Sequence, residues 1–454
     1  MKNPHTTINS NHSFIQHQME DASKAKNLKL RFVTSEEEFY ALQSEWDNLI
    51  QQTNAKIYQT FEWLSNWWRF YGDKKIDKLH CLLFYHNEIL VGIAPLYIRH
   101  KYFLGYNFYR RIYFLGGDTS VGTSFGLFCD GGPSDYLDII SLPHYEHSIA
   151  VAFLQYIQEI KPSNTQLVLV DVRADSNLYL YFLPILRKSD LSFKILEADK
   201  SPYIVTPDSF DDFLKSRSSS VRRRLQQSWK EVGEKSLFTL NDEKDANDLD
   251  TAIGNIKRLH QNRWNFLGYP GFFGDPRYEK FFEKVLQLFF QRGWLWCKTI
   301  MAGDRCLAGR LAFRYKGEYY DYLSGIDDKA PEMKRRPGLV LLLAMIQDSI
   351  MEKASVIDLL RGEESYKKDF TVNMISNWNV LITLDNKNNR FKSIFLNLFL
   401  GLKFLAFLID RECKLFKVTH NYKRFPISII FFIKFRTQSF INKIKELLNK
   451  KRTK

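Results

Sequence analysis

Two stretches of the chain share one pattern of apolar and polar positions. Residues 79–98 and residues 294–315 each hold an apolar run, a three-residue polar turn and a second apolar run that contains a glycine. This pattern predicts a β-hairpin in both places. The second stretch continues through a turn at 316–318 into a third apolar run at 319–324. Two similar hairpins so far apart in one chain indicate an internal duplication.

The segments around the hairpins predict the rest of the fold. Helical patterns precede each hairpin, and in the second copy a loop, a helix and a buried strand follow the third strand. Helices combined with largely antiparallel strands predict an α/β protein of the α+β type, with mixed sheets flanked by helices. The helices are expected at 35–52, 61–71, 147–160, 245–266, 277–292 and 338–353, and the further strands at 166–172 and 356–360.

The chain of 454 residues is long enough for two domains and a tail. We predict a polar leader at 1–29, a first lobe at 30–200, a second lobe at 201–390 and a basic helical tail at 391–454. The leader lacks the apolar core of a secretory signal, so export is not expected. Five scattered cysteines show no metal-ligand spacing and no disulfide framework, which predicts reduced thiols, no metal and a cytoplasmic location.

Most of the basic character lies in the tail. The whole chain has a formal net charge of +14, and residues 411–454 hold 13 Lys and Arg against two Asp and Glu. This distribution disfavours nucleic acid as a partner of the folded body and favours an anionic membrane surface as a partner of the tail. The apolar run at 394–409 would span about 24 Å as a helix, less than a bilayer core of roughly 30 Å. We therefore expect peripheral contact with the inner face of the cytoplasmic membrane, with packing of the tail on the body as the alternative.

The loop before the helix at 338–353 carries a motif. The order of strands, loop and helix over residues 294–360 resembles the core of the GNAT acyltransferase fold, whose loop binds the pyrophosphate of acyl-CoA. The signature of that loop is Arg or Gln, two residues, Gly, one residue, then Gly or Ala. Here Arg335 and Gly338 fit, whereas Val340 replaces the small residue. The resemblance implies that acetyl-CoA or another acyl-CoA is held by Lys334, Arg335, Arg336, Gly338, Leu339 and Val340.

A wider resemblance covers residues 58–384. This region is similar to the acetyltransferase-like family of bacterial exopolysaccharide and cellulose gene clusters, which is related to the Fem-type peptidyl transferases. The resemblance implies two tandem GNAT-like domains and an acyl-CoA-dependent N-acetyltransferase acting on an amino sugar, a peptide or a polysaccharide precursor of the cell envelope. The matching pieces are Phe61-Glu62-Trp63, Trp67-Trp68, 92–96, 113–116, Leu214, 222–224, Gly233, 259–260, 263–264, Gly303, 307–308, 337–338, 361–363 and 366–367.

Acyl transfer to an amine also needs a base and an acid near the acceptor. His260 can act as a base, and Arg263, one helical turn away, can hold a phosphate or carboxylate. The segment after the strand at 356–360 offers Glu363 as a base, Tyr366 as an acid for the thiolate and Lys367 as a phosphate ligand. For each of these residues a structural role is the alternative.

Three further candidates come from other parts of the chain. Asp321 can act as a base if its side chain points inward from the third strand. Asp135 can reach the acceptor from the first lobe, although capping of a helix explains it equally well. Arg222 and Arg223 lie between the two halves of the chain and can bind an anionic acceptor, although such a cluster is usually a solvated helix face.

Two other functions stay open at this stage. The related Fem-type enzymes imply an aminoacyl-tRNA-dependent transferase, but residues 1–410 lack the clustered positive charge that a tRNA surface needs. The departure at Val340 leaves a non-catalytic accessory protein of a membrane polysaccharide synthase as the second alternative.

Overall fold

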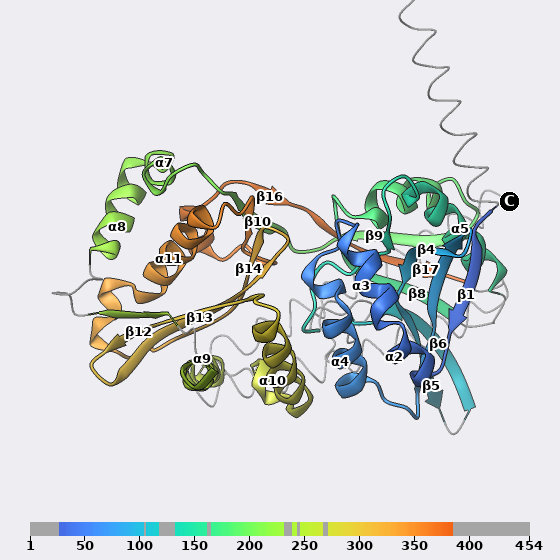
Figure 1. Cartoon of the computed structure of the whole chain (residues 1–454), viewed down its shortest axis with the longest axis horizontal. Coiled ribbons are helices and arrows are strands. Elements are labelled where there is room, and N and C mark those ends of the chain that lie inside the picture. Colours follow the sequence, from blue (N-terminus) through green and yellow to red (C-terminus); the bar gives the residue numbers. More distant parts are fainter. Residues whose placement is uncertain are drawn as a thin grey trace, which may run out of the picture.

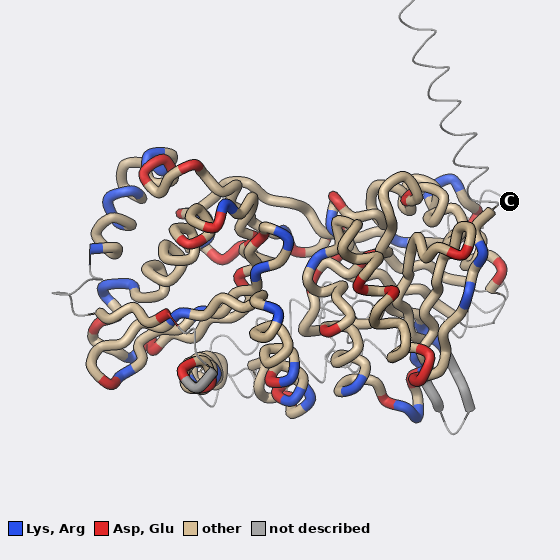
Figure 2. Tube along the Cα trace, in the orientation of Figure 1, with Lys and Arg blue, Asp and Glu red and all other residues tan. Residues whose placement is uncertain are grey.

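The computed structural model describes residues 27–103, 106–117, 132–160, 165–230, 238–242, 246–266 and 271–384. The predicted tail at 391–454 and most of the predicted leader lie outside these residues. Figure 1 shows two lobes side by side, each with its own sheets and helices. Lys and Arg are interspersed with Asp and Glu over both lobes (Figure 2).

The first lobe contains two sheets. The predicted hairpin at 79–98 is confirmed by β3 and β4, which pair antiparallel across a turn in which Asn87 and Glu88 have positive φ. The four-stranded sheet has the order β1 (Lys29–Val33), β3 (Cys81–His86), β4 (Ile89–Ala94) and β7 (Ile140–Ser141). The six-stranded sheet has the order β2 (Asp77–Leu79), β5 (Leu96–Phe103), β6 (Tyr106–Phe114), β8 (Thr165–Arg173), β17 (Asn377–Thr383) and β9 (Ser192–Glu197). The helices are α2 (Glu36–Ala41), α3 (Gln43–Gln51), α4 (Phe61–Tyr71), α5 (Glu146–Glu159) and α6 (Leu183–Leu186).

The second lobe is built on one seven-stranded sheet. Its three predicted consecutive strands are confirmed as β12, β13 and β14, and the predicted helix at 338–353 is confirmed as α11. The sheet has the order β11 (Thr239–Asp242), β12 (Leu295–Ala302), β13 (Arg305–Tyr315), β14 (Glu318–Ile326), β15 (Val356–Asp358), β10 (Ser201–Val205) and β16 (Met374–Ile375). The helices are α7 (Phe210–Lys215), α8 (Ser219–Trp229), α9 (Ala246–Phe266), α10 (Pro276–Gln291) and α11 (Pro337–Met351). Helices α9 and α10 lie on one face of this sheet and α11 on the other (Figure 1).

Two paired glycines bring α9 close to the sheet. Gly309 of β13 and Gly325 of β14 are register partners. A Cβ on Gly325 would lie 2.5 Å from the carbonyl oxygen of Ile256, and a Cβ on Gly309 would lie 2.4 Å from Cγ1 of the same residue. Larger side chains would force α9 away from the strands, because backbone atoms cannot yield as a flexible side chain does.

Strands β14 and β15 separate after a short parallel pairing. Their register runs only from Glu318 and Val356 to Tyr320 and Asp358. Beyond this point β14 continues along β13, whereas the backbone N–H groups of Leu359 and Gly362 donate to carbonyl oxygens near β10. A split therefore opens between β14 and the segment after β15, close to the start of α11.

The last strand of the chain returns to the first lobe. β17 lies within the range predicted for the second lobe, yet it pairs antiparallel with β8 on one side and β9 on the other. Figure 1 shows the connection from β16 crossing between the lobes. Edge-to-face aromatic contacts such as Tyr58 with Phe313 and Trp63 with Phe281 also join the lobes in one continuous hydrophobic core. The two lobes are thus held together by both backbone pairing and packing.

The described helices give no candidate membrane span. None of them combines the length and the apolar composition that crossing a bilayer requires.

Candidate functional site

The N-terminus of α11 lies beside three basic residues. A 3-10 turn at Pro331–Arg335 leads into Arg336, which takes the left-handed conformation at φ 56° and ψ 58°. Among the described residues no side chain caps the first turn of α11, and Lys334, Arg335 and Arg336 are exposed. Pro337 has no N–H, and the N–H groups of Leu339 and Val340 donate to the carbonyl oxygen of Arg336, so the positive end of the helix dipole and the basic side chains are what favours an anion here. This end of α11 has the chemistry that a pyrophosphate needs.

The glycine of the motif allows α11 to approach the end of β14. A Cβ on Gly338 would lie 2.7 Å from Cδ1 of Ile326, the last residue of β14. Val340 is fully buried in a cluster with Leu307 and Leu341, and Leu339 packs against a neighbouring cluster. The side chain of Val340 therefore serves the core, and its departure from the signature does not obstruct the exposed turn.

A buried polar cluster lies at the split between β14 and β15. The guanidinium of Arg310 on β13 forms an ion pair with the carboxylate of Asp321 on β14, and both side chains are at most 5% exposed. The Arg310 guanidinium also lies 3.5 Å from the carbonyl oxygen of Gly338. Tyr366, from the 3-10 turn Ser365–Asp369, lies against the same pair. Burial raises the pKa of Tyr366 to about 12, so its hydroxyl stays protonated at neutral pH.

The segment after β15 divides into exposed and structural residues. The Glu363 side chain is exposed. Lys367 is 4% exposed, and its Nζ donates to the carbonyl oxygens of Arg361 at 3.0 Å and Gly362 at 3.2 Å. Gly362 has a φ of 107°, which side chains rarely adopt. Lys367 thus holds this loop in place.

His260 lies in an aromatic pocket on α9. Its side chain is 5% exposed, its ring stacks on Phe272 at 5.5 Å, and its Nδ1 has no hydrogen-bond partner among the described residues. Burial, with a smaller contribution from the charge of Arg263, lowers the pKa of His260 to about 4. The imidazole is therefore neutral at neutral pH, while Arg263 lies exposed on the same helix.

The buried His260 makes a pH-dependent contribution to stability. Because its folded pKa lies below the unfolded value of about 6.5, the unfolded state binds the proton more tightly. This histidine should cost no stability above pH 6.5 and about 3 kcal/mol as the pH falls to 4, since one pKa unit corresponds to about 1.4 kcal/mol. Urea unfolding across this pH range should show a shallower loss of stability in His260→Leu. The exposed control His144→Asn should keep the wild-type slope, and a wild-type slope in His260→Leu would contradict the assignment.

Asp135 faces an arginine from the other lobe. The guanidinium of Arg361 forms ion pairs with the carboxylates of Asp135 and Asp171, both of the first lobe. The position of Asp135 thus brings it to the junction between lobes, where it is already paired.

The arginines of α8 lie away from the first lobe. Arg222 is half-buried, Arg223 is exposed, and their neighbour Arg224 forms an ion pair with Asp369. Figure 1 shows α8 beside α11, at the end of the second lobe that is remote from the first. Although this segment lies between the two halves of the sequence, it is not between the two lobes in space.

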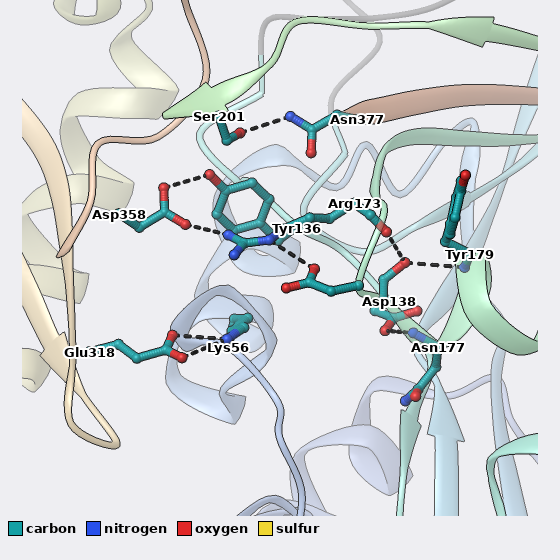
Figure 3. A network of polar contacts seen from close by, with 12 residues as sticks. Lys56, Tyr136, Asp138, Arg173, Asn177, Tyr179, Ser201, Glu318, Asp358 and Asn377 are labelled. Atoms are coloured by element: carbon teal, nitrogen blue, oxygen red, sulfur yellow. Dashed lines mark hydrogen bonds and ion pairs between the residues drawn. The ribbon is translucent and has the colours of Figure 1, made fainter. Parts of the chain in front are cut away.

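A polar network at the lobe junction was not identified from the sequence (Figure 3). Lys56 of the first lobe forms an ion pair with Glu318 at 2.8 Å. The hydroxyl of Tyr136 donates to Asp358 at 2.9 Å, and Arg173 pairs with the same carboxylate. Of these residues, Lys56, Tyr136, Arg173 and Glu318 line a cavity of about 460 Å³. Their partners are far apart in the chain, so no local spacing could have revealed them.

Comparison with known families agrees with the predicted GNAT resemblance for part of the chain, and does not reach the narrower exopolysaccharide and cellulose type. Residues 219–368 match a family model described as "Acetyltransferase (GNAT) domain". No curated protein matches the chain in sequence.

Several solved structures are similar to the chain. FemX is 12% identical, with 77% of this chain and 96% of that chain covered and a TM-score of 0.48. The C-terminal domain (DUF2156) of a putative lysylphosphatidylglycerol synthetase from Agrobacterium fabrum is 9% identical, with coverage of 80% and 96% and a TM-score of 0.44. A tandem GNAT protein from the clavulanic acid biosynthesis pathway is 9% identical, with coverage of 79% and 100% and a TM-score of 0.39. The segment that matches the GNAT acetyltransferase model, residues 219–368, contains the start of α11 and the split between β14 and β15.

Proposed function

We propose that the chain is an acyl-CoA-dependent N-acyltransferase whose donor binds to the second lobe. The observation that carries this proposal is the GNAT match over residues 219–368, because it covers the exposed N-terminus of α11. The pyrophosphate of the donor would lie on the first turn of α11, beside Lys334 and Arg335. The acceptor would be an amino sugar, a peptide or a polysaccharide precursor of the cell envelope, and the tail would hold the enzyme at the inner face of the membrane.

The chemistry needs few side chains. The edge of β14 beyond Tyr320 is not paired with β15, so its backbone N–H groups can donate to the thioester oxygen as negative charge develops there. Tyr366 stays protonated and lies at the split, which makes it the candidate acid for the leaving thiolate. Asp321 is held by Arg310, and the pKa of His260 near 4 makes that imidazole a weak base. Glu363 has the exposure that a base for an incoming amine requires.

The donor site is tested by binding of acetyl-CoA to the full chain. The variant Lys334→Ala/Arg335→Ala/Arg336→Gly removes three positive charges, and glycine suits the left-handed φ of residue 336. Because charge-assisted contacts contribute roughly 1.5–3 kcal/mol each, acetyl-CoA should bind at least about tenfold more weakly to this variant. The matched control Lys75→Ala/Arg187→Ala/Lys188→Ala removes three exposed charges of the first lobe and should bind like the wild type.

The other outcomes separate the alternatives. Equal weakening in both triple variants would mean that general charge, and not the end of α11, attracts the donor. Salt-sensitive binding of total tRNA without binding of acetyl-CoA would favour the aminoacyl-tRNA-dependent transferase. Binding of neither would favour the accessory protein.

A further inference from the structure

The cavity between the lobes is separate from the predicted donor site. Its second-lobe wall consists of Lys316, Glu318 and Tyr320, and the first lobe provides the rest. Tyr320 is the last residue of β14 that pairs with β15, so the cavity reaches the point where the two strands part. A ligand here would meet the GNAT domain at the closed end of the split, with the start of α11 at the other end.

The positive charges of the cavity are all engaged by the protein. Lys56 pairs with Glu318 at 2.8 Å (Figure 3). Arg173 pairs with Asp358 and, at 2.9 Å, with Asp175. The Nζ of Lys316 donates to the carbonyl oxygens of Ile50 and Thr53. Carboxylates therefore neutralise Lys56 and Arg173, whereas Lys316 is held in place by neutral carbonyl oxygens.

One carboxylate of the cavity is not engaged. Glu146, the first residue of α5, is half-buried in the wall and has no hydrogen bond or ion pair with any other described residue. A carboxylate that is partly withdrawn from water binds an ammonium group more strongly than an exposed one does. Glu146 therefore offers an ammonium group of a ligand a carboxylate that no other described residue neutralises.

The remaining lining is suited to hydroxyl groups. Most of the side chains in the wall are polar, among them Gln59, Ser141, Ser176 and Asn177. Each of these four side chains already has a hydrogen bond within the protein, and an acyl chain would offer nothing to the donor and acceptor positions that remain. A lysine side chain would satisfy Glu146 but would pair with few of the others. An amino sugar offers one ammonium group and several hydroxyl groups to the same space.

We propose that this cavity binds the acyl acceptor, and that the acceptor is an amino sugar recognised through its amino group by Glu146. The role as acceptor rests on the proposed function. In the reaction the sugar nitrogen forms a bond to the thioester carbonyl carbon and the carbon–sulfur bond breaks. The thiolate takes up one proton, and the ammonium of the sugar loses two in becoming an amide. The products are an N-acyl sugar, the free thiol of CoA and one proton.

Calorimetric titration of the full chain at pH 7 tests the proposal. The probe is the fully deacetylated disaccharide of glucosamine, which should bind saturably. Binding should weaken at least about tenfold in Glu146→Gln, which removes the charge, and in Leu180→Trp, which narrows the cavity from a half-exposed position. Glu159→Gln changes an exposed carboxylate of the same helix and should bind like the wild type. Thermal unfolding of each variant shows that a loss of binding is not a loss of folding.

Comparison ligands and a parallel titration with acetyl-CoA show which hypothesis a negative result contradicts. The N,N′-diacetylated disaccharide, which has no amino group, and glucosamine 6-phosphate should bind more weakly than the probe. Equal binding of the diacetylated disaccharide, tighter binding of a lysine tripeptide, or equal affinity in Glu146→Gln would overturn the proposal. Acetyl-CoA binding without sugar binding would overturn this inference alone, whereas sugar binding without acetyl-CoA binding would overturn the acceptor role and the proposed function with it.

Discussion

Arg361→Ala will lower the free energy of unfolding by about 3–5 kcal/mol, because it removes the guanidinium that pairs with two buried carboxylates. Arg361 belongs to the second lobe, and its guanidinium forms ion pairs with Asp135 and Asp171 of the first lobe. The two aspartate side chains are each 8% exposed, so water cannot replace the lost charge. Urea unfolding followed by tryptophan fluorescence measures the loss.

A partly exposed arginine of the same lobe provides the control. Arg314 pairs with Glu352 at 2.7 Å, but a third or more of each side chain is exposed. Such pairs contribute about 0–1 kcal/mol, so Arg314→Ala should change the stability little. A loss in Arg361→Ala no larger than the loss in Arg314→Ala would show that this ion-pair cluster does not join the lobes.

Local sequence patterns predicted where the helices and strands lie better than they predicted which strands pair with one another. The hairpin of β3 and β4, the three strands from β12 to β14 and helix α11 each follow from a short run of apolar and turn residues. Their signal lies in neighbouring positions, where periodicity and turn chemistry act. The sheet order of the first lobe was harder to predict, because its six-stranded sheet includes β17, whose partner β8 lies some 200 positions earlier. Nothing in the sequence of β17 distinguishes a strand of one lobe from a strand of the other.

The same limit applies to the candidate site. The loop at 334–340 was identified because a glycine next to basic residues before a helix is a local arrangement. The structural role of Lys367 was not identified from the sequence. Its hydrogen bonds are accepted by backbone carbonyl oxygens, which the bend at Gly362 turns toward it. The cavity between the lobes depends on contacts such as that of Lys56 with Glu318, across most of the chain. Composition alone cannot tell a buried ion pair from a catalytic one.

Asp321→Asn will also cost about 3–5 kcal/mol of stability, because it leaves the guanidinium of Arg310 buried without its counter-ion. The two side chains are 3% and 5% exposed, and the Nε of Arg310 already lacks a partner among the described residues. The control is Asp327→Asn, since Asp327 follows the same strand but pairs with the exposed Arg305. Urea unfolding should separate the two variants by several kcal/mol, and the double variant Arg310→Met/Asp321→Leu should recover much of the loss, because replacing both partners removes the unpaired charge.

The same variants show whether Asp321 acts as a catalytic base or only stabilises the fold. If Asp321 acts only as the ion-pair partner of Arg310, it affects activity by keeping the shape of the split between β14 and β15. The double variant should then regain donor binding together with stability. As a base, it would be needed for turnover whatever the stability of the protein. Asp321→Asn would then keep wild-type stability and acetyl-CoA binding, lose turnover, and show a rate that no longer rises with pH on the acid side. Because the pair is buried, we expect Asp321→Asn to lose stability and the double variant to recover acetyl-CoA binding.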